Sequence, residues 1–138
     1  MPPNPSHSFI TTFDDHPFHQ MLGLTLVESS ANFGKILLTK SAATPQGIGG
    51  SVHGGVLASM VDISMLVAMF AQMREGEEPA GTADLNISYL RQALGERIYA
   101  TAKVVKRGRM LSNIEVDITD AEDRLCARGR VLYAFRPH

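Results

Sequence analysis

The hydrophobic pattern changes its period part-way along the chain. From residue 53 to about residue 74, apolar and small residues are almost continuous. This predicts one helix, from His53 or Gly54 to about Arg74, that is buried on most sides. Residues 75–79 contain a glycine and a proline, which are expected to end that helix. After Pro79 the apolar residues alternate with polar ones, which is typical of strands with one buried face.

Four segments with this alternation follow one another and are predicted as strands. Their alternating positions lie at residues 83–89, 98–104, 113–118 and 125–135. Turns at 94–95, 107–108 and 120–123 join them, and connections this short indicate antiparallel neighbours. Two more apolar runs, at 24–27 and 36–39, predict a hairpin around Asn32, Phe33 and Gly34. We therefore expect an α+β domain, with an antiparallel sheet of about six strands wrapped around one long apolar helix.

The N-terminal region is expected to lie outside this core. Residues 1–13 begin with a proline-rich stretch and are predicted to be a flexible tail, and residues 14–138 a single domain. Residues 14–23 are predicted as a short helix ended by Gly23, and residues 44–51 as a glycine-rich loop. The chain lacks a basic segment followed by an apolar one at its start, and the long helix contains Asp62. We expect a cytoplasmic protein.

Composition and charge exclude several classes of function. The chain has 138 residues, and 13 Lys and Arg against 14 Asp and Glu, which offers no electrostatic basis for binding nucleic acid. Its single cysteine, Cys126, excludes a disulfide framework and a zinc site built on cysteines. His16 and His19 fit a helix start better than a metal site. Phosphate-binding and dinucleotide-binding glycine motifs do not occur, nor does a serine-hydrolase elbow.

The candidate chemistry lies in the segment from His53 to Asp62. Gly54 and Gly55 fall at the first turn of the helix, where backbone N–H groups lack partners and the helix dipole adds positive charge. Such a turn can stabilise an oxyanion, and glycine lets a substrate oxygen approach closely. Asp62 is a lone carboxylate among apolar residues, which is often functional. Two structural alternatives stay open: tight packing for the glycines, and an ion pair with an arginine for Asp62.

The spacing of these groups bears on the oligomeric state. Gly54 and Asp62 are eight residues apart, which is about 12 Å along a helix axis. One substrate carbonyl cannot touch both within a single chain. If both act on one substrate, they come from different subunits, and the sequence then predicts a homodimer with two composite sites.

Several segments, in order, resemble the hotdog-fold acyl-CoA thioesterases, in the branch typified by the phenylacetate-pathway enzymes. The resemblance covers most of the chain. It is carried by residues 16–23 (HPFHQMLG), by 52–55 (VHGG) with Asp62, by 82–90 (TADLNISYL) and by 106–111 (KRGRML). It implies a hotdog fold and hydrolysis of an acyl-CoA to a carboxylate and free CoA. It also implies a site shared across a homodimer, which can pair into a homotetramer.

The resemblance also implies roles for individual residues. The Gly54 N–H would polarise the thioester carbonyl, and Asp62 of the neighbouring subunit would act as nucleophile or as general base. Thr82 would help to position water near the acid. His53 is expected to orient the loop and, with Gly55, to belong to the substrate-binding residues. No metal or redox cofactor is implied, because coenzyme A enters only as part of the substrate.

Two positions depart from the family pattern. The family usually has Asn or Gln seven residues before the first glycine, where this chain has Gly47. Gln46 is adjacent and can take that role if the loop is shifted. The branch with a threonine one turn after its acid is not matched, since Leu66 stands there.

A basic turn provides candidates for the coenzyme A phosphates. Its members are Lys106, Arg107, Gly108 and Arg109, and Arg91 at a strand end is a further candidate. From the residues alone, a solvated hairpin turn is the alternative. Two other functions stay open for the chain as a whole. One is a non-catalytic acyl-CoA binding module, and the other a hotdog dehydratase, although the Asp-plus-His motif of those enzymes is not evident.

Overall fold

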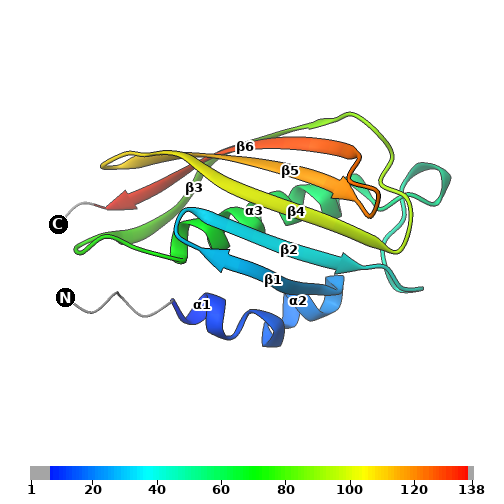
Figure 1. Ribbon diagram of the computed structural model, residues 1–138, viewed down its shortest axis with the longest axis horizontal. Coiled ribbons are helices and arrows are strands. Elements are labelled where there is room, and N and C mark those ends of the chain that lie inside the picture. Colours follow the sequence, from blue (N-terminus) through cyan, green and yellow to red (C-terminus); the bar gives the residue numbers. More distant parts are fainter. Residues whose placement is uncertain (1–6, 137–138) are drawn as a thin grey trace.

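The computed structural model describes residues 7–136, in which six strands surround one central helix (Figure 1). The helices are α1 (Ser8–Thr11), α2 (Pro17–Leu22) and α3 (Gly54–Phe70), with 3-10 turns η1 (Phe13–Asp15) and η2 (Ile48–Gly50). The strands are β1 (Leu24–Ser30), β2 (Phe33–Thr39), β3 (Glu78–Tyr89), β4 (Arg97–Arg107), β5 (Leu111–Asp120) and β6 (Leu125–Arg136). All pairings are antiparallel, in the order β1-β2-β4-β5-β6-β3. The predicted α+β hotdog fold is confirmed.

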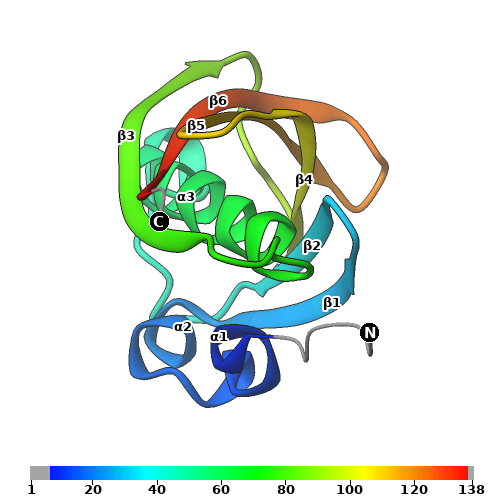
Figure 2. The same cartoon turned by 90° about the vertical axis from the view of Figure 1, so that its left-hand side faces the viewer.

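The sheet curls around α3 and encloses most of its surface (Figure 2). Two glycines allow this close packing. A β-carbon on Gly129 of β6 would lie 2.5 Å from Cγ1 of Val61, and one on Gly34 of β2 would lie 2.7 Å from Cγ1 of Val67. Both strands therefore approach the helix at distances that only glycine permits, and the core forms between α3 and the concave face of the sheet.

One stripe of α3 is not covered by its own sheet. Most of the helix is buried, as its nearly continuous apolar sequence predicts. The remaining residues recur at helical spacing and so share one face. They are Gly54, Gly55, Ala58, Ser59, Asp62 and Leu66.

The long helix ends earlier than predicted. It stops at Phe70, four residues before Arg74. Side chains bind backbone groups in its last turn and just beyond it. Arg107 of β4 donates to the carbonyl oxygen of Met69, and the backbone N–H of Arg74 donates to Oε1 of Glu77. The chain then turns at Gly76, which has a φ of 81°. No helix within residues 7–136 is long and apolar enough to cross a membrane.

The prediction that β3 and β4 are neighbours is wrong. Residues 90–96 join them, but β5 and β6 lie between them in the sheet. The connection crosses the end of the curled sheet, where Leu90 and Arg91 donate backbone bonds to Cys126, and Val52 donates one to Ala93. Strand β3 is consequently an edge strand, and Pro79 within it fits an edge, where a missing N–H is tolerated.

The predicted flexible tail over residues 1–13 lies partly outside the described residues. The described part is folded, which corrects the prediction for that part. Ile10 and Phe13 are buried, and the His7 side chain caps α1 by accepting a bond from the backbone N–H of Phe9. Phe13 packs 4.0 Å, between ring centroids, from His19 of α2. These aromatic contacts hold the segment against the domain.

Candidate active site

The first turn of α3 has one backbone donor without a partner. Nδ1 of His53 accepts the Gly55 N–H at 2.9 Å, and the His53 carbonyl accepts the N–H groups of Val56 and Leu57. Within residues 7–136 the Gly54 N–H has no hydrogen-bond acceptor. It lies at the positive end of a 17-residue helix, so it is available to a substrate oxygen.

Tyr89, at the end of β3, fixes this turn. Its hydroxyl donates to the Gly54 carbonyl at 2.7 Å. A β-carbon on Gly54 would lie 3.2 Å from the Tyr89 ring, so the ring packs directly on the glycine. The sequence pattern indicates only a strand position for Tyr89, because nothing in the sequence indicates this contact across 35 positions.

A cavity of about 430 Å³ opens beside the Gly54 turn. It lies between the glycine-rich loop, the start of α3 and the β3–β4 connection. Gly47 lines it and Gln46 is not among its lining residues, although Gln46 forms a backbone bridge with Val52. The lining residues are Gly47, Ile48, Ser51, Val52, His53, Gly54, Leu57, Tyr89, Leu90, Arg91, Gln92 and Ala93.

Asp62 is brought together with Thr82, as the resemblance implies. Asp62 is partly exposed on the uncovered stripe of α3, and its Oδ1 accepts a hydrogen bond from Oγ1 of Thr82 on β3 at 2.7 Å. The predicted ion pair alternative is not what the structure contains, because the partner of Asp62 is a hydroxyl. The carboxylate keeps a second oxygen for other chemistry.

Tyr133 of β6 is a neighbour of this pair that sequence analysis missed. It is the cross-strand partner of Thr82 and is 4% exposed. Burial raises the pKa of its phenol, and the negative charge of Asp62 raises it further, so the hydroxyl keeps its proton. The strand pattern places Tyr133 among apolar residues, and its nearness to the acid depends on the β3–β6 register.

Gly54 and Asp62 are not brought together within one chain. Helix α3 is continuous between them, which keeps them about 12 Å apart along its axis. The cavity beside Gly54 is not lined by Asp62. The two halves of the predicted site are therefore separate in the single chain.

Arg107, a candidate for the coenzyme A phosphates, makes most of its contacts within the fold. Its guanidinium donates to the Met69 carbonyl at 3.1 Å and to Asn32 Oδ1, and pairs with Glu77 at 3.3 Å. Burial lowers the pKa of Arg107, an effect that Glu77 opposes. The guanidinium remains a cation, since arginine is not deprotonated in proteins. Four of its five N–H donors are bound by the protein itself.

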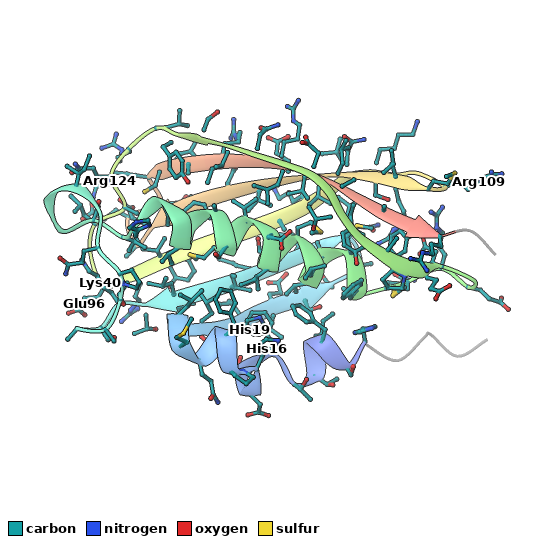
Figure 3. The ribbon with its side chains drawn as sticks, turned by 180° about the vertical axis from the view of Figure 1, so that it is seen from behind. His16, His19, Lys40, Glu96, Arg109 and Arg124 are labelled. Atoms are coloured by element: carbon teal, nitrogen blue, oxygen red, sulfur yellow. The ribbon has the colours of Figure 1, made fainter. Side chains whose placement is uncertain are left out.

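The other predicted cations are exposed and lie at two ends of the molecule. Lys106 lies near the end of β4, and Arg109 lies in the β4–β5 turn. That turn is tight, because a β-carbon on Gly108 would lie 2.0 Å from the Leu111 carbonyl oxygen. Figure 3 shows Arg109 at the opposite end from Lys40, which donates to the Gly50 carbonyl of the glycine-rich loop. Arg91 lines the cavity at the Lys40 end.

Metal ligation finds no support in residues 7–136. They contain no group of three or more His, Cys, Asp or Glu side chains placed to hold a metal ion. His16 caps α2 by accepting the Phe18 N–H, and Nδ1 of buried His19 lies 2.8 Å from the Phe13 carbonyl oxygen. Both rings are therefore used in local structure.

Comparison of the sequence with known proteins shows the family of this chain. The family model of the thioesterase superfamily matches residues 49–127, which include the end of the glycine-rich loop, the Gly54 turn, Asp62 and Thr82. The chain belongs to the thioesterase superfamily. This membership identifies it as a thioester hydrolase, as the resemblance implied. A curated relative, acyl-coenzyme A thioesterase 13 of Homo sapiens, is 38% identical over 117 residues, covering 82% of this chain and 81% of that protein.

Solved structures of this superfamily share the fold. Zebrafish thioesterase superfamily member 2 is 28% identical with a TM-score of 0.79, and the match covers 94% of each chain. The PaaI protein of the Escherichia coli phenylacetic acid degradation operon has a TM-score of 0.78, covering 91% of this chain and 88% of that one. Its identity is 21%, so that likeness establishes the fold and not membership of the same branch.

Proposed function

We propose that this chain hydrolyses acyl-CoA thioesters in a site formed by two copies. The observation that carries the proposal is the separation of its two chemical halves along one helix. Among residues 7–136 the Gly54 N–H has no acceptor, and Gly54 lines a cavity. The partly exposed Asp62 carboxylate lies about 12 Å further along the same uncovered stripe. A second copy can bring the two halves together. The similarity to acyl-coenzyme A thioesterase 13 supports acyl-CoA as the substrate class.

Two-fold symmetry gives this dimer a defined geometry. In a two-fold pair, each surface meets its own copy, so Gly54 meets Asp62 when the axis passes midway between them, at Ala58. The same axis is consistent with the contacts of strand β3. Thr82 contacts Asp62 and Tyr89 contacts Gly54, so the midpoint on the strand falls between Leu85 and Asn86. One two-fold axis can therefore pass through both midpoints. In that dimer the open edge of β3 and the uncovered stripe of α3 both lie at the interface.

The reaction follows from the groups placed in such a site. The thioester carbonyl oxygen accepts the Gly54 N–H, which stabilises the negative charge of the tetrahedral intermediate. Asp62 of the second copy takes a proton from water, and the resulting hydroxide attacks the carbonyl carbon. The C–S bond then breaks, and the CoA thiolate leaves with the proton returned by Asp62. In the alternative route Asp62 attacks directly and forms an anhydride, which water hydrolyses.

The two routes differ in the fate of the oxygen atoms. In a single turnover in oxygen-18 water, activation of water puts the label into the carboxylate product at once. A mixed anhydride that is hydrolysed at the Asp62 carbonyl puts the first label into Asp62. Mass spectrometry of the product and of the peptide containing Asp62 separates them.

Coenzyme A recognition is composite in this arrangement. The same two-fold axis carries the second copy's β4–β5 turn, at the far end of its helix, toward the glycine-rich loop of the first. Lys106 and Arg109 of the second copy then approach the cavity that Arg91 lines. These exposed cations suit the phosphates of coenzyme A, whereas four of the five N–H donors of Arg107 are bound within the chain. Assignment to the phenylacetate-pathway branch and pairing into a tetramer are further parts of the proposal.

Thiol release from aryl, short-chain and long-chain CoA esters tests the activity, with Asp62→Asn alongside. We expect turnover by the parent and a loss of several orders of magnitude in Asp62→Asn, because the amide can neither accept a proton nor attack. Tight binding without turnover, and an Asp62→Asn variant that behaves like the parent, would favour a non-catalytic acyl-CoA binding module.

A mixed dimer tests the composite site. Gly54→Pro removes the N–H, and proline is well tolerated at the first helical position. Gly54→Ala is the matched control, since it keeps the N–H and adds a similar carbon beside Tyr89. Dimers of one Gly54→Pro chain and one Asp62→Asn chain, purified through two tags, contain one doubly altered site and one intact site. We expect about half of the parental activity; an inactive mixed dimer would place both groups of each site in one chain.

A further inference from the structure

The Gly54 N–H is one donor, and an oxyanion is ordinarily held by more than one. The second donor has to come from a group that faces the same cavity. Among the described lining residues, five have side chains that can donate a hydrogen bond. They are Ser51, His53, Tyr89, Arg91 and Gln92.

Two of these five donate to backbone carbonyls, and a third, His53, uses one ring nitrogen as an acceptor. Oγ of Ser51 donates to the Ile48 carbonyl at 2.6 Å, and the Tyr89 hydroxyl donates to the Gly54 carbonyl at 2.7 Å. Nδ1 of His53 accepts the Gly55 N–H, so a neutral His53 carries its proton on Nε2, on the side of the ring away from that bond. The positive charge of Arg91 suits a phosphate better than a carbonyl oxygen.

Gln92 is the uncharged amide among the five, and both hydrogens of its carboxamide are free within residues 7–136. The amide lies against the glycine-rich loop, where a β-carbon on Gly49 would be 3.4 Å from Oε1 and 3.6 Å from Nε2. Neither amide atom has a hydrogen-bond partner within residues 7–136. The Gln92 side chain, which has two donor hydrogens, thus lines the same cavity as Gly54.

The backbone on both sides of Gln92 is anchored. The Arg91 N–H donates to the Cys126 carbonyl at 3.0 Å, and the Ala93 carbonyl accepts the Val52 N–H at 3.0 Å. Ala93 is buried, at 1% exposure. The β3–β4 connection is therefore fixed against the loop before α3, and it presents Gln92 in a position set by the fold. A donor held in advance stabilises developing charge without a cost of reorganisation.

We propose that Nε2 of Gln92 is the second hydrogen-bond donor to the thioester carbonyl oxygen that the Gly54 N–H binds. The inference rests on the proposed function. It assigns to the β3–β4 connection a role in the chemistry as well as in the wall of the cavity. Because the amide is uncharged, its contribution is the same across the working pH range.

Three single variants test this assignment by thiol release. Gln92→Ala removes the donor, and we expect kcat to fall by about 100-fold with little change in KM. Gln92→Glu keeps the shape but replaces the donor with a negative charge, so its kcat should be no higher than that of Gln92→Ala. A purely structural role would leave this exposed, isosteric variant close to the parent. Gln72→Ala, an exposed glutamine just beyond α3, is the control and should match the parent.

A second-site variant tests the same hydrogen bond by rescue. Gly47 lines the cavity, and its φ of −102° and ψ of −151° are open to any residue. A β-carbon there would lie 3.2 Å from Oγ of Ser51, a contact that the hydroxyl can relieve by a small movement. Gly47→Asn can therefore present another carboxamide to the cavity. In the Gln92→Ala background we expect it to raise kcat by about tenfold or more.

The outcomes separate this inference from the function on which it rests. If the parent hydrolyses no CoA ester, the proposed function fails. If the parent is active and Gln92→Ala or Gln92→Glu keeps a kcat within twofold of it, the assignment of Gln92 is overturned and the function stands. A loss confined to KM would also overturn it, because it would make Gln92 a binding contact only. A folded Gly47→Asn, Gln92→Ala double variant with no recovery counts against a shared carbonyl oxygen.

Discussion

At the scale of single residues, the Asp62 carboxylate is held by a hydrogen bond from another element of the fold. Asp62 lies on α3, and the hydroxyl that binds it lies on β3, 20 positions later. The hydrogen bond fixes one carboxylate oxygen and leaves the other for water or substrate. In the proposed reaction, Thr82 would act on the chemistry through the orientation of Asp62.

Replacing Thr82 by valine tests that role, because valine has nearly the same shape and no hydroxyl. We expect kcat to fall roughly tenfold, since one hydrogen bond to a charged group is lost at an exposed position. Thr82→Ser keeps the hydroxyl and should retain most of the activity. Steady-state thiol release measures both, and a valine variant as active as the serine variant would contradict the role.

His19 links the stability of the fold to pH. Burial lowers its pKa below the usual 6.5, and the hydrogen bond to the Phe13 carbonyl only partly opposes this. The unfolded chain therefore binds more protons than the folded one as the pH falls below about 6.5. We expect the free energy of unfolding from urea titrations to be largest above that pH and to decrease toward pH 5. His19→Gln should flatten this part of the curve; an unchanged slope would assign the effect to other groups.

At the scale of elements, glycines in the strands let the sheet pack closely against helix α3. Periodicity predicted that the helix would be buried, and its start at Gly54 was predicted correctly because capping is a local property. Its end was predicted four residues too late, because Arg107 of β4 binds the Met69 carbonyl in the last turn and Glu77 binds the Arg74 N–H just beyond it. The predicted pairing of β3 with β4 is wrong because it also depends on distant parts of the chain. A short connection can cross the end of a strongly curled sheet and join strands that are not neighbours.

Gly129→Ala tests the contact between β6 and α3. The added carbon would lie 2.5 Å from Cγ1 and 2.8 Å from Cγ2 of Val61, so the strand or the helix has to move. Overpacking of this kind costs about 1–3 kcal/mol in the free energy of unfolding. Val61→Ala in the same chain removes the clashing methyl groups and should recover part of that loss. Urea denaturation of the two single variants and the double variant measures the coupling, and strict additivity would argue against the contact.

At the scale of the whole molecule, the uncovered stripe of α3 and the open edge of β3 lie next to each other. A single chain leaves the half-exposed small residues of the helix facing outward, and it leaves the acid and the Gly54 turn apart. A two-fold partner on this face would cover the stripe and complete two identical sites. Oligomeric state and activity should therefore be lost together.

Ala58→Arg places a charge at the proposed two-fold axis, where two copies would face each other. Ala58 is half-exposed in the single chain, so the fold should tolerate the change. We expect the mass measured by light scattering to fall from that of two chains to the 15.0 kDa of one, with a loss of activity. Ala121→Arg, in the exposed β5–β6 turn, is the control and should remain a dimer. An active monomer would contradict the composite site.

The sequence by itself determined the features that depend on neighbouring residues. These are the apolar period of α3, the glycine turn at its start, the alternation of the strands and the placement of Asp62 among apolar residues. The tertiary structure alone decided which distant groups meet: Tyr89 with Gly54, Thr82 and Tyr133 beside Asp62, Arg107 at the end of the helix, and Gln92 in the cavity. The physical reason is that helix capping and periodicity act over a few residues, whereas these contacts depend on strand order and register, which the packing of the whole sheet around α3 sets.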